Sequence, residues 1–409
     1  MNVARDPGRV VVVGGGLAGF SAADQLRTLG HQGEITIVDA EPHAYDRPPL
    51  SKNLFDEDFS LASLAFATKE GLVAKRIDTV FGVRATAIDA DAASVTLADG
   101  RVLAADTVLL SVGGSPRTLS VPGNDLPGVY TLRTFDDALA IRERAQPGAR
   151  AVVIGAGLIG AELASALQRA GVAVTLLGPA PVPLLPVLGE LLATHLHSMH
   201  VAHGVRAEVG VAASITAAGD ALIVTTVSGE DIPADVVVVG VGIVPNTSLA
   251  EAAGLAVDNG VLVDRHHQTS APKVFAAGDL ARLVDDDGVA HRREEHWEAA
   301  QLSGQHAAYG MLGLEAPARG ASWFWSDRHG IHLEATGRLS GEGELIVRQG
   351  GAHPAVFLVH DGLLVGAAAI DDNNTVRAAR RLIDRRIPVS PTELADPAIV
   401  LKSLLRASR

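Results

Sequence analysis

The hydrophobic pattern of the first half of the chain occurs twice. Residues 9–13 form a short β-branched run typical of a buried parallel strand, residues 20–29 carry apolar positions at helical spacing, and residues 34–38 form a second apolar run. The same order returns at residues 151–154, 161–170 and 172–177, about 140 residues later. The pattern therefore predicts two separate β-α-β units.

Other segments complete this organisation. The apolar runs at 107–113 and 234–240 would each close one unit, and the alternating stretches 94–103 and 221–232 predict hairpins. From about residue 321 the pattern changes to short strands at 331–336, 344–348, 355–360 and 363–370, followed by an arginine-rich helix at 376–386. We predict an α/β fold with two Rossmann-like dinucleotide-binding domains, at 1–117 with 247–320 and at 118–246, and a C-terminal α+β domain at 321–409.

A glycine-rich loop lies between the first strand and the first helix. It runs from Gly14 through Gly16 to Gly19, and Asp39 ends the next strand 20 residues further on. Glycines at this spacing allow a tight turn, close approach of a pyrophosphate, and close packing of helix on strand, while the acid accepts hydrogen bonds from a ribose. The alternative is a glycine turn without a ligand. Two copies in full strand–loop–helix context favour binding.

The second loop runs from Gly155 through Gly157 to Gly160, and no acid follows it. Its next strand ends at Gly178, and the proline-rich stretch 179–186 contains no arginine. An acid at this place selects NAD and an arginine selects NADP. The residues alone therefore leave the choice of nicotinamide nucleotide open.

Composition excludes several classes of protein. The chain has 409 residues, 47% of them hydrophobic, and a net charge of −13, which argues against a nucleic-acid or membrane-surface binder. It has no cysteine, so it has no disulfide, no thiolate nucleophile and no iron–sulfur cluster of its own. No apolar run approaches the ~20 residues of a membrane span, and residues 1–9 lack the pattern of a signal peptide. We expect a cytoplasmic protein.

Six motifs carry a family resemblance. They are YDRPPLSK at 45–52, YTLRTFDD at 130–137, GAGLIGAE at 155–162, GIVPN at 242–246, AAGD at 276–279 and WFWSD at 323–327. In this order they resemble the FAD-dependent pyridine-nucleotide oxidoreductases of glutathione-reductase-like fold. Because cysteine is absent, the closer resemblance is to the oxygenase-coupled ferredoxin reductases. Three departures from that family are Gly178, the stretch 179–186 and SVGG at 111–114.

The resemblance implies a set of cofactor-binding residues. The adenosine diphosphate part of FAD would be held by Gly14, Gly16, Leu17, Ala18, Gly19 and Asp39. The path to the flavin would be lined by Arg47, Lys52, Ala85 and Arg133, the ribityl chain would be bonded by Asp279, and Trp297 would lie near the flavin ring. The nicotinamide nucleotide would be bound by Gly155, Gly157, Leu158, Ile159, Gly160 and Gly242, and NADH would be favoured over NADPH.

The resemblance also implies that Lys52 and Glu162 form a catalytic ion pair close to flavin N5. A fixed cation there would lower the barrier to hydride arrival, because negative charge builds on the flavin. The alternatives are a surface lysine, a helix-dipole role for Glu162, and simple core filling for Trp297. Trp323 and Trp325 fit domain packing better than nicotinamide contact.

The implied function is passage of electrons from NAD(P)H through FAD to a separate [2Fe–2S] ferredoxin of a P450 or Rieske-type oxygenase. Residues 371–409 carry eight basic and five acidic side chains, which indicates either a solvated helix face or a docking patch for an acidic carrier. The alternatives are a reductase for rubredoxin or another small acceptor, and a flavoprotein that senses NADH, similar to apoptosis-inducing factor.

Histidines gather at two further places. His195, His197, His200 and His203 fall on a predicted helix at 189–203, and His266 and His267 are adjacent. Acids or cysteines that could complete a metal site are missing nearby, so we expect no metal. We predict a solvated helix face for the first group and a surface loop for the second.

Overall fold

The computed structural model describes residues 5–406. Its contacts divide the chain into two units. The first unit contains Met1–Pro48, Asp58–Ser115 and Ile243–Arg319, and the second contains Pro49–Glu57, Pro116–Gly242 and Gly320–Arg409. Residues 1–4 of the polar N-terminal stretch, and Arg409 of the basic C-terminal segment, lie outside the described residues.

A parallel sheet forms the core of the first unit. Its strand order is β19-β7-β1-β2-β3, with β1 at Val10–Val13, β2 at Ile35–Asp39, β3 at Asp78–Phe81, β7 at Thr107–Leu110 and β19 at Val274–Ala276. All four residues of β1 are buried, as expected for a central strand covered on both faces. Strands β1, β2 and β7 coincide with the predicted apolar runs at 9–13, 34–38 and 107–113.

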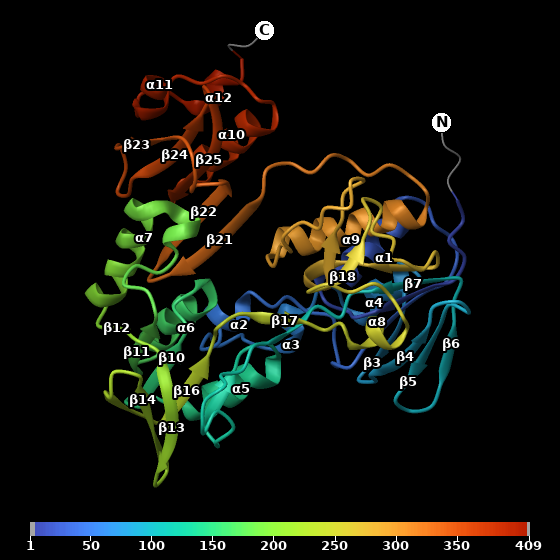
Figure 1. Ribbon diagram of the computed structural model, residues 1–409, viewed down its shortest axis with the longest axis horizontal. Coiled ribbons are helices and arrows are strands. Elements are labelled where there is room, and N and C mark those ends of the chain that lie inside the picture. The colour runs from blue at the N-terminus through green and yellow to red at the C-terminus, as the bar shows by residue number, and fades with distance from the viewer. Residues whose placement is uncertain (1–4, 407–409) are drawn as a thin grey trace. The chain divides into compact units, whose positions relative to one another are not determined.

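Two helices of the first unit lie side by side, α1 at Leu17–Thr28 and α9 at Trp297–Met311 (Figure 1). A Cβ on Gly304 of α9 would lie 2.0 Å from the carbonyl oxygen of Ala18, so only glycine allows this approach. Leu26, Ile37 and Phe275 lie in the core cluster that these helices share with the sheet. The contact fixes α1 directly behind the first glycine loop.

Smaller elements complete the first unit. A three-stranded antiparallel sheet consists of β4 at Ala85–Asp89, β5 at Ser94–Leu97 and β6 at Val102–Ala104. The rest are α3 at Leu61–Leu64, α4 at Lys69–Ala74, α8 at Ser248–Ala252, β18 at Val261–Val263, η1 at Gly278–Leu280 and β20 at Ala281–Leu283. Strands β8 at Gly114–Pro116 and β17 at Ile243–Pro245 lie where the chain passes from one unit to the other.

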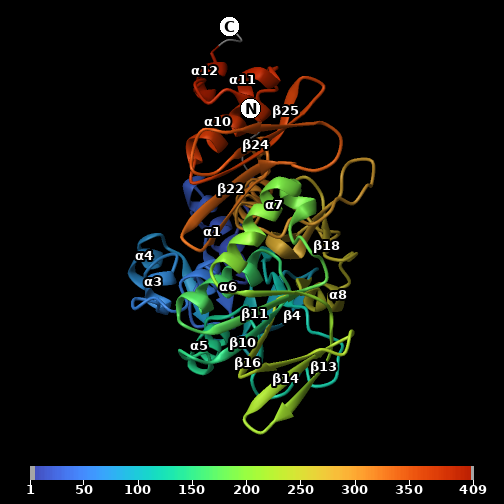
Figure 2. The same cartoon turned by 90° about the vertical axis from the view of Figure 1, so that its left-hand side faces the viewer.

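The second unit contains the second parallel sheet. Its order is β12-β11-β10-β16-β9, with β9 at Val129–Thr131, β10 at Arg150–Ile154, β11 at Ala173–Gly178, β12 at Arg206–Val209 and β16 at Val236–Val239. Helices α2 at Pro49–Lys52, α5 at Phe135–Arg144 and α6 at Leu158–Arg169 belong to this unit. The hairpin predicted at 221–232 is part of a small sheet of β13 at Ala212–Ala218, β14 at Ala221–Thr226 and β15 at Asp231–Ala234. Figure 2 shows β13 and β14 of this sheet.

An antiparallel sheet forms the C-terminal part of the second unit. Its order is β21-β22-β25-β24-β23, with β21 at Trp323–Arg328, β22 at Ile331–Gly337, β23 at Glu344–Arg348, β24 at Ala355–His360 and β25 at Leu363–Ile370. Helices α10 at Asn373–Asp384, α11 at Pro391–Ala395 and α12 at Leu401–Leu404 pack with it. The predicted α/β class with a C-terminal α+β part is confirmed, although the sequence pattern did not predict β21 as a strand.

Helix α7, at Leu185–Ala202, packs against this C-terminal sheet (Figure 2). Leu188 and Leu192 share a buried cluster with Leu333 and Leu358. Burial of these side chains joins the second parallel sheet and the C-terminal sheet into one unit.

Within residues 5–406 no helix is both long and apolar enough to cross a bilayer.

Candidate functional site

The first glycine loop has the geometry of a phosphate-binding turn. Gly14 has a φ of 109°, a value that favours glycine, and a Cβ on it would lie 2.4 Å from the carbonyl oxygen of Ser111. Gly16 is the N-cap of α1, and a Cβ on it would meet nothing within 4 Å. Open space over free N–H groups at a helix N-terminus is what a pyrophosphate requires, so the loop fits FAD.

Gly19 closes this loop from behind. A Cβ on it would lie 2.0 Å from the carbonyl oxygen of Gly14 and 2.6 Å from Ser111 Oγ. The Ser111 hydroxyl donates to the carbonyl oxygen of Gly14 at 2.8 Å. Ser111, one of the three departures from the family, therefore braces the loop rather than disturbing it. The predicted residues Leu17 and Ala18 form the first turn of α1.

Asp39 lies at the carboxyl end of β2 and joins the loop directly. Its carboxylate accepts hydrogen bonds from the backbone N–H groups of Gly15 and of Glu41. Burial raises the pKa of Asp39 above its usual value, although these hydrogen bonds oppose the effect. Arg47 donates to Glu41 at 2.7 Å, so Glu41, which the sequence analysis missed, holds a predicted FAD residue in place.

The remaining predicted FAD residues of the first unit differ in their surroundings. The Trp297 indole donates to Asp46 at 2.8 Å, and burial raises the pKa of Asp46. Asp279 lies in η1, directly after Gly278, whose φ of 75° favours glycine. Ala85, by contrast, places its methyl group in the hydrophobic core, so it could meet a ligand only through its backbone.

The second glycine loop repeats the first. A Cβ on Gly155 would lie 2.3 Å from the carbonyl oxygen of Gly240, and one on Gly160 would lie 1.9 Å from that of Gly155. Gly157 is the N-cap of α6, with nothing within 4 Å of a Cβ. Among the predicted neighbours, Leu158 opens α6, Ile159 is exposed, and Gly242 has a φ of 103°.

The carboxyl end of β11 differs from that of β2. Gly178 takes the place that Asp39 has in the first unit, and a Cβ on it would lie 3.0 Å from the Ala156 Cβ. No carboxylate therefore binds the second loop at this point, and the close approach of Ala156 leaves little room for one.

Lys52 and Glu162 meet at the junction of α2 and α6. Lys52 Nζ lies 2.6 Å from Glu162 Oε1, with the Lys52 side chain 12% exposed and that of Glu162 6% exposed. The hydroxyls of Ser51 and Ser326 each donate to Glu162 at 2.7 Å. Two hydroxyl donors and a cation hold this buried carboxylate in one orientation, so the ion pair has a fixed geometry. Its place beside a flavin stays a prediction.

Lys52 has a second acidic partner that the sequence analysis missed. Asp327 Oδ2 lies 2.9 Å from Lys52 Nζ, and the lysine ammonium lies 5.6 Å from the centre of the Trp325 ring. Asp327 and Trp325 both belong to the WFWSD motif at 323–327, and this motif was the signal in the sequence that could have indicated their contact with Lys52. Burial favours the neutral form of Asp327, but hydrogen bonds from His332 and Lys52 outweigh it and lower the Asp327 pKa. Trp323 stacks on Trp325 with ring centres 5.1 Å apart.

Arg133 lies in the second unit, just before α5. Its backbone N–H donates to Asp137 at 2.9 Å, as part of the N-terminal cap of that helix. The hydrogen bond fixes the backbone of Arg133 and leaves its predicted contact with FAD a prediction.

Two histidine predictions are wrong. His200 is buried rather than solvated, because α7 turns it toward the C-terminal sheet, where its Nδ1 lies 2.8 Å from His329 Nε2. His267 is buried as well, with its Nδ1 bonded to the Ala276 carbonyl. Burial lowers the pKa of each to about 3. In the part of the chain that the structure describes, no group of three or more acidic or histidine side chains could hold a metal ion.

Comparison with protein families gives two matches. Residues 8–304 match the model described as pyridine nucleotide-disulphide oxidoreductase, and residues 323–405 match the one described as reductase C-terminal. The second match begins at Trp323, the first residue of β21.

Individual proteins are similar over nearly the whole chain. The ferredoxin reductase component of chlorobenzene dioxygenase from Cupriavidus sp. (strain PS12) is 34% identical, with 98% of each chain covered. The ferredoxin--NAD(+) reductase component of the biphenyl dioxygenase system from Paraburkholderia xenovorans (strain LB400) is also 34% identical, with 97% of this chain and 98% of the relative covered. Among solved structures, the covalent putidaredoxin reductase–putidaredoxin complex has a TM-score of 0.91, 32% identity and 99% coverage of each chain.

Proposed function

Because the chain belongs to the pyridine nucleotide-disulphide oxidoreductase family, we propose that it is an FAD-dependent reductase that takes electrons from NADH and passes them to a ferredoxin of an oxygenase system. The family resemblance that the sequence motifs predicted is confirmed. Relatives of this kind serve dioxygenases, and one solved relative is linked to putidaredoxin.

One observation carries this function: two phosphate-binding loops occur in a chain without cysteine. Two loops provide for two dinucleotides, one resident and one exchanging. Without a thiol pair or a cluster ligand, this chain cannot pass electrons to a disulfide or hold an iron–sulfur cluster. The electrons must therefore leave to a separate acceptor, which fits the relatives that reduce a ferredoxin.

We assign the first loop, with Asp39, to the adenosine diphosphate part of FAD, and the second loop to NADH. Bound FAD supplies the conversion of a two-electron hydride donor into single-electron steps. The protein contributes N–H groups at two helix N-termini, which hold the phosphates without a bound metal. Arg47, held by Glu41, contributes a cation to the first site.

We assign electrostatic catalysis to Lys52. Its ammonium is held by Glu162 at 2.6 Å and by Asp327 at 2.9 Å, so it does not need to reorganise when negative charge develops. Glu162 acts as the orienting partner. Ser51 and Ser326 keep the carboxylate of Glu162 turned toward Lys52.

A rapid-mixing experiment tests the function. The FAD-loaded protein is mixed anaerobically with NADH or NADPH, bleaching of the flavin absorbance is followed, and a [2Fe–2S] ferredoxin, a rubredoxin or monodehydroascorbate is then added. We expect fast bleaching by NADH and fast return of absorbance with the ferredoxin. Slow bleaching with a persistent charge-transfer band would instead support an NADH sensor, and return with rubredoxin alone would support the small-acceptor alternative.

We further propose that α10 helps to dock the ferredoxin. One face of this helix is buried through Val376, Ala379 and Leu382, while Arg377 and Arg381 are exposed. Arg385 and Arg386, directly after the helix, are exposed as well. A positive surface on a protein of net charge −13 would steer an acidic carrier toward this place.

Charge reversal tests this docking proposal. Arg377→Glu with Arg381→Glu should slow ferredoxin reduction at low ionic strength and flatten its salt dependence, while bleaching by NADH stays unchanged. Arg84→Glu with Arg101→Glu changes the net charge equally at exposed positions of the first unit and serves as the control. Equal rates for the two double variants would contradict docking at α10.

We place the reaction in the cytoplasm, because NADH is an intracellular reductant.

A further inference from the structure

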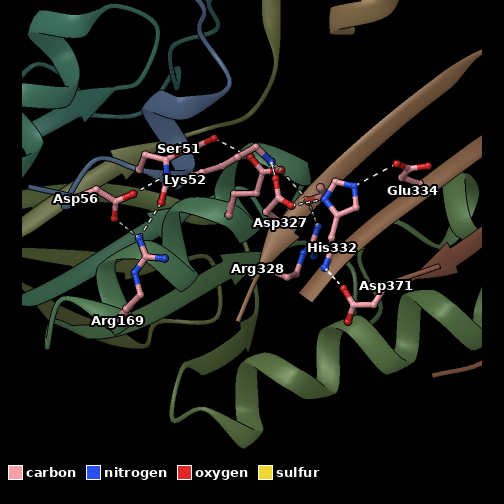
Figure 3. A network of polar contacts seen from close by, with 12 residues as sticks. Ser51, Lys52, Asp56, Arg169, Asp327, Arg328, His332, Glu334 and Asp371 are labelled. Carbon is pink, nitrogen blue, oxygen red and sulfur yellow. Dashed lines mark hydrogen bonds and ion pairs between the residues drawn. The ribbon is translucent and has the colours of Figure 1, made fainter. Parts of the chain in front are cut away.

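Asp327 connects Lys52 to a histidine. Strands β21 and β22 are antiparallel, and their register places Asp327 directly opposite His332. Asp327 Oδ1 lies 2.6 Å from His332 Nδ1, and its other oxygen lies 2.9 Å from Lys52 Nζ (Figure 3). One carboxylate therefore bridges the lysine and the imidazole.

The second ring nitrogen of His332 also faces a carboxyl group. Nε2 lies 3.3 Å from Glu334 Oε1, and Glu334 is 4% exposed. The other oxygen of Glu334 is buried with no hydrogen-bond partner among the described residues. Carboxylates only accept hydrogen bonds, whereas a neutral imidazole has a single N–H. Two carboxylates facing the two nitrogens therefore favour the doubly protonated, positively charged form of the His332 ring.

The electrostatics agree with this geometry. Burial would lower the pKa of His332, but the hydrogen bonds and charges of Asp327 and Glu334 outweigh burial and raise it above the usual value. The backbone N–H of His332 donates to Asp371 at 2.9 Å. The charged groups around this ring, directly or through Asp327 and Ser326, are Lys52, Glu162, Asp327, Arg328, Glu334 and Asp371.

The ring can exchange its proton with solvent. The His332 side chain is 35% exposed. It lines a hollow of about 500 Å³ together with Asp371, Asp372, Asn373 and Asn374. Loss of the proton would remove one of the two cations that form ion pairs with Asp327, and Lys52 would remain as the other.

We propose that His332 is a positioning residue for hydride transfer, whose positive charge offsets Asp327 and so keeps the field of Lys52 available to the flavin. Deprotonation removes one positive charge from the chain Lys52–Asp327–His332 and makes the bound FAD harder to reduce. The hydride and its electron pair pass from NADH to the flavin, and the proton of His332 is not consumed. This inference rests on the proposed function.

The test follows pH in the FAD-loaded protein. The rate of flavin bleaching by NADH and the flavin midpoint potential are measured from about pH 6 to about pH 9, a range that spans ordinary and raised histidine pKa values. In the wild type the rate should fall by about three- to tenfold as pH rises through the pKa of His332, as expected for one partly exposed charge, and the potential should fall more steeply there than the flavin's own proton uptake requires. His332→Gln should be slow, with a pH-independent rate and without the additional slope of the potential. His332→Lys should be faster than His332→Gln and should also lack the additional slope.

A matched control and a second readout complete the design. His360 is also 35% exposed and lies 3.5 Å from a carboxylate, that of Asp361, so His360→Gln should keep the wild-type profile. NMR titration of the ring in the holoenzyme should place the His332 pKa above the ordinary value. A wild-type profile in His332→Gln, or a titration at or below the ordinary histidine pKa, would overturn the inference alone. Absence of any bleaching by NADH in the wild type would overturn the proposed function, and the inference with it.

Discussion

Lys52 Nζ lies 2.6 Å from Glu162 Oε1, although the two residues are 110 positions apart. The short helix α2 carries the lysine, and the second turn of α6 carries the carboxylate. Both residues belong to the second unit. The relationship ties the YDRPPLSK motif to the helix that opens with the second glycine loop.

Glu162→Gln should slow flavin reduction by NADH about ten- to a hundredfold, because the variant keeps the shape of the side chain but removes the charge that orients Lys52. FAD content should not change. Stopped-flow bleaching of the flavin measures the effect. Asp56→Asn is the control, since Asp56 contacts Arg169 at the same helix junction at 2.9 Å but not the Lys52 ammonium. A Glu162→Gln rate equal to that of the control would contradict the role of the pair.

One alanine substitution in each glycine loop tests which loop binds which dinucleotide. Gly16→Ala adds a methyl group where nothing lies within 4 Å, so the protein should fold normally but bind FAD more weakly. Gly157→Ala should keep its FAD and raise KM for NADH, since the same open space occurs over the second loop. Flavin content and steady-state kinetics separate the two. Loss of FAD in both variants, or in neither, would contradict the assignment of the loops.

Gly19→Ala should behave differently from Gly16→Ala. Its Cβ would lie 2.0 Å from the carbonyl oxygen of Gly14, so the strand, loop and helix would have to separate. We expect a loss of roughly 1–3 kcal/mol in the free energy of unfolding, as for overpacking in a tight core. Thermal unfolding of the two variants in the cofactor-free state measures the difference, and equal midpoints would refute the packing role.

The missing acid after β11 can be restored. The double variant Ala156→Gly with Gly178→Asp recreates the relationship of Gly15 and Asp39, because the smaller residue removes the Cβ at 3.0 Å. The ratio of kcat/KM for NADH over NADPH should rise about tenfold, since a carboxylate bonds the free ribose hydroxyl and repels a 2′-phosphate. Ala156→Gly alone should leave the ratio unchanged. An unchanged ratio in the double variant would show that the nucleotide ribose lies elsewhere.

Acid should destabilise the fold through His200. Burial lowers its pKa to about 3, so the unfolded chain, with an ordinary histidine pKa of 6.5, binds more protons between these values. Stability is therefore full above the unfolded pKa and falls as pH drops below it, by up to about 1.4 kcal/mol per pH unit for one proton. His200→Gln should flatten the slope of unfolding free energy from about pH 7 to about pH 5. The exposed His43→Gln should not, and parallel slopes would contradict the account.

The sequence predicts the two β-α-β units well because each is local: strand, loop, helix and strand follow one another within a short stretch. The glycines of each loop also stand where the backbone conformation or close packing requires them. The Lys52–Glu162 pair follows from family motifs and not from spacing. Asp327 and His332 could not be assigned from pattern, because their roles depend on the register of β21 against β22. The histidines of α7 could not be assigned either, since helical spacing does not reveal which face meets the C-terminal sheet.

The most direct measurement compares wild type with Lys52→Met in anaerobic rapid mixing with NADH. Both proteins should be yellow and carry equal FAD, and the wild type should bleach at least about a hundredfold faster, because the variant removes the cation that meets developing negative charge. A wild type that takes up no FAD, or a Lys52→Met protein that bleaches at the wild-type rate, would contradict the central claim.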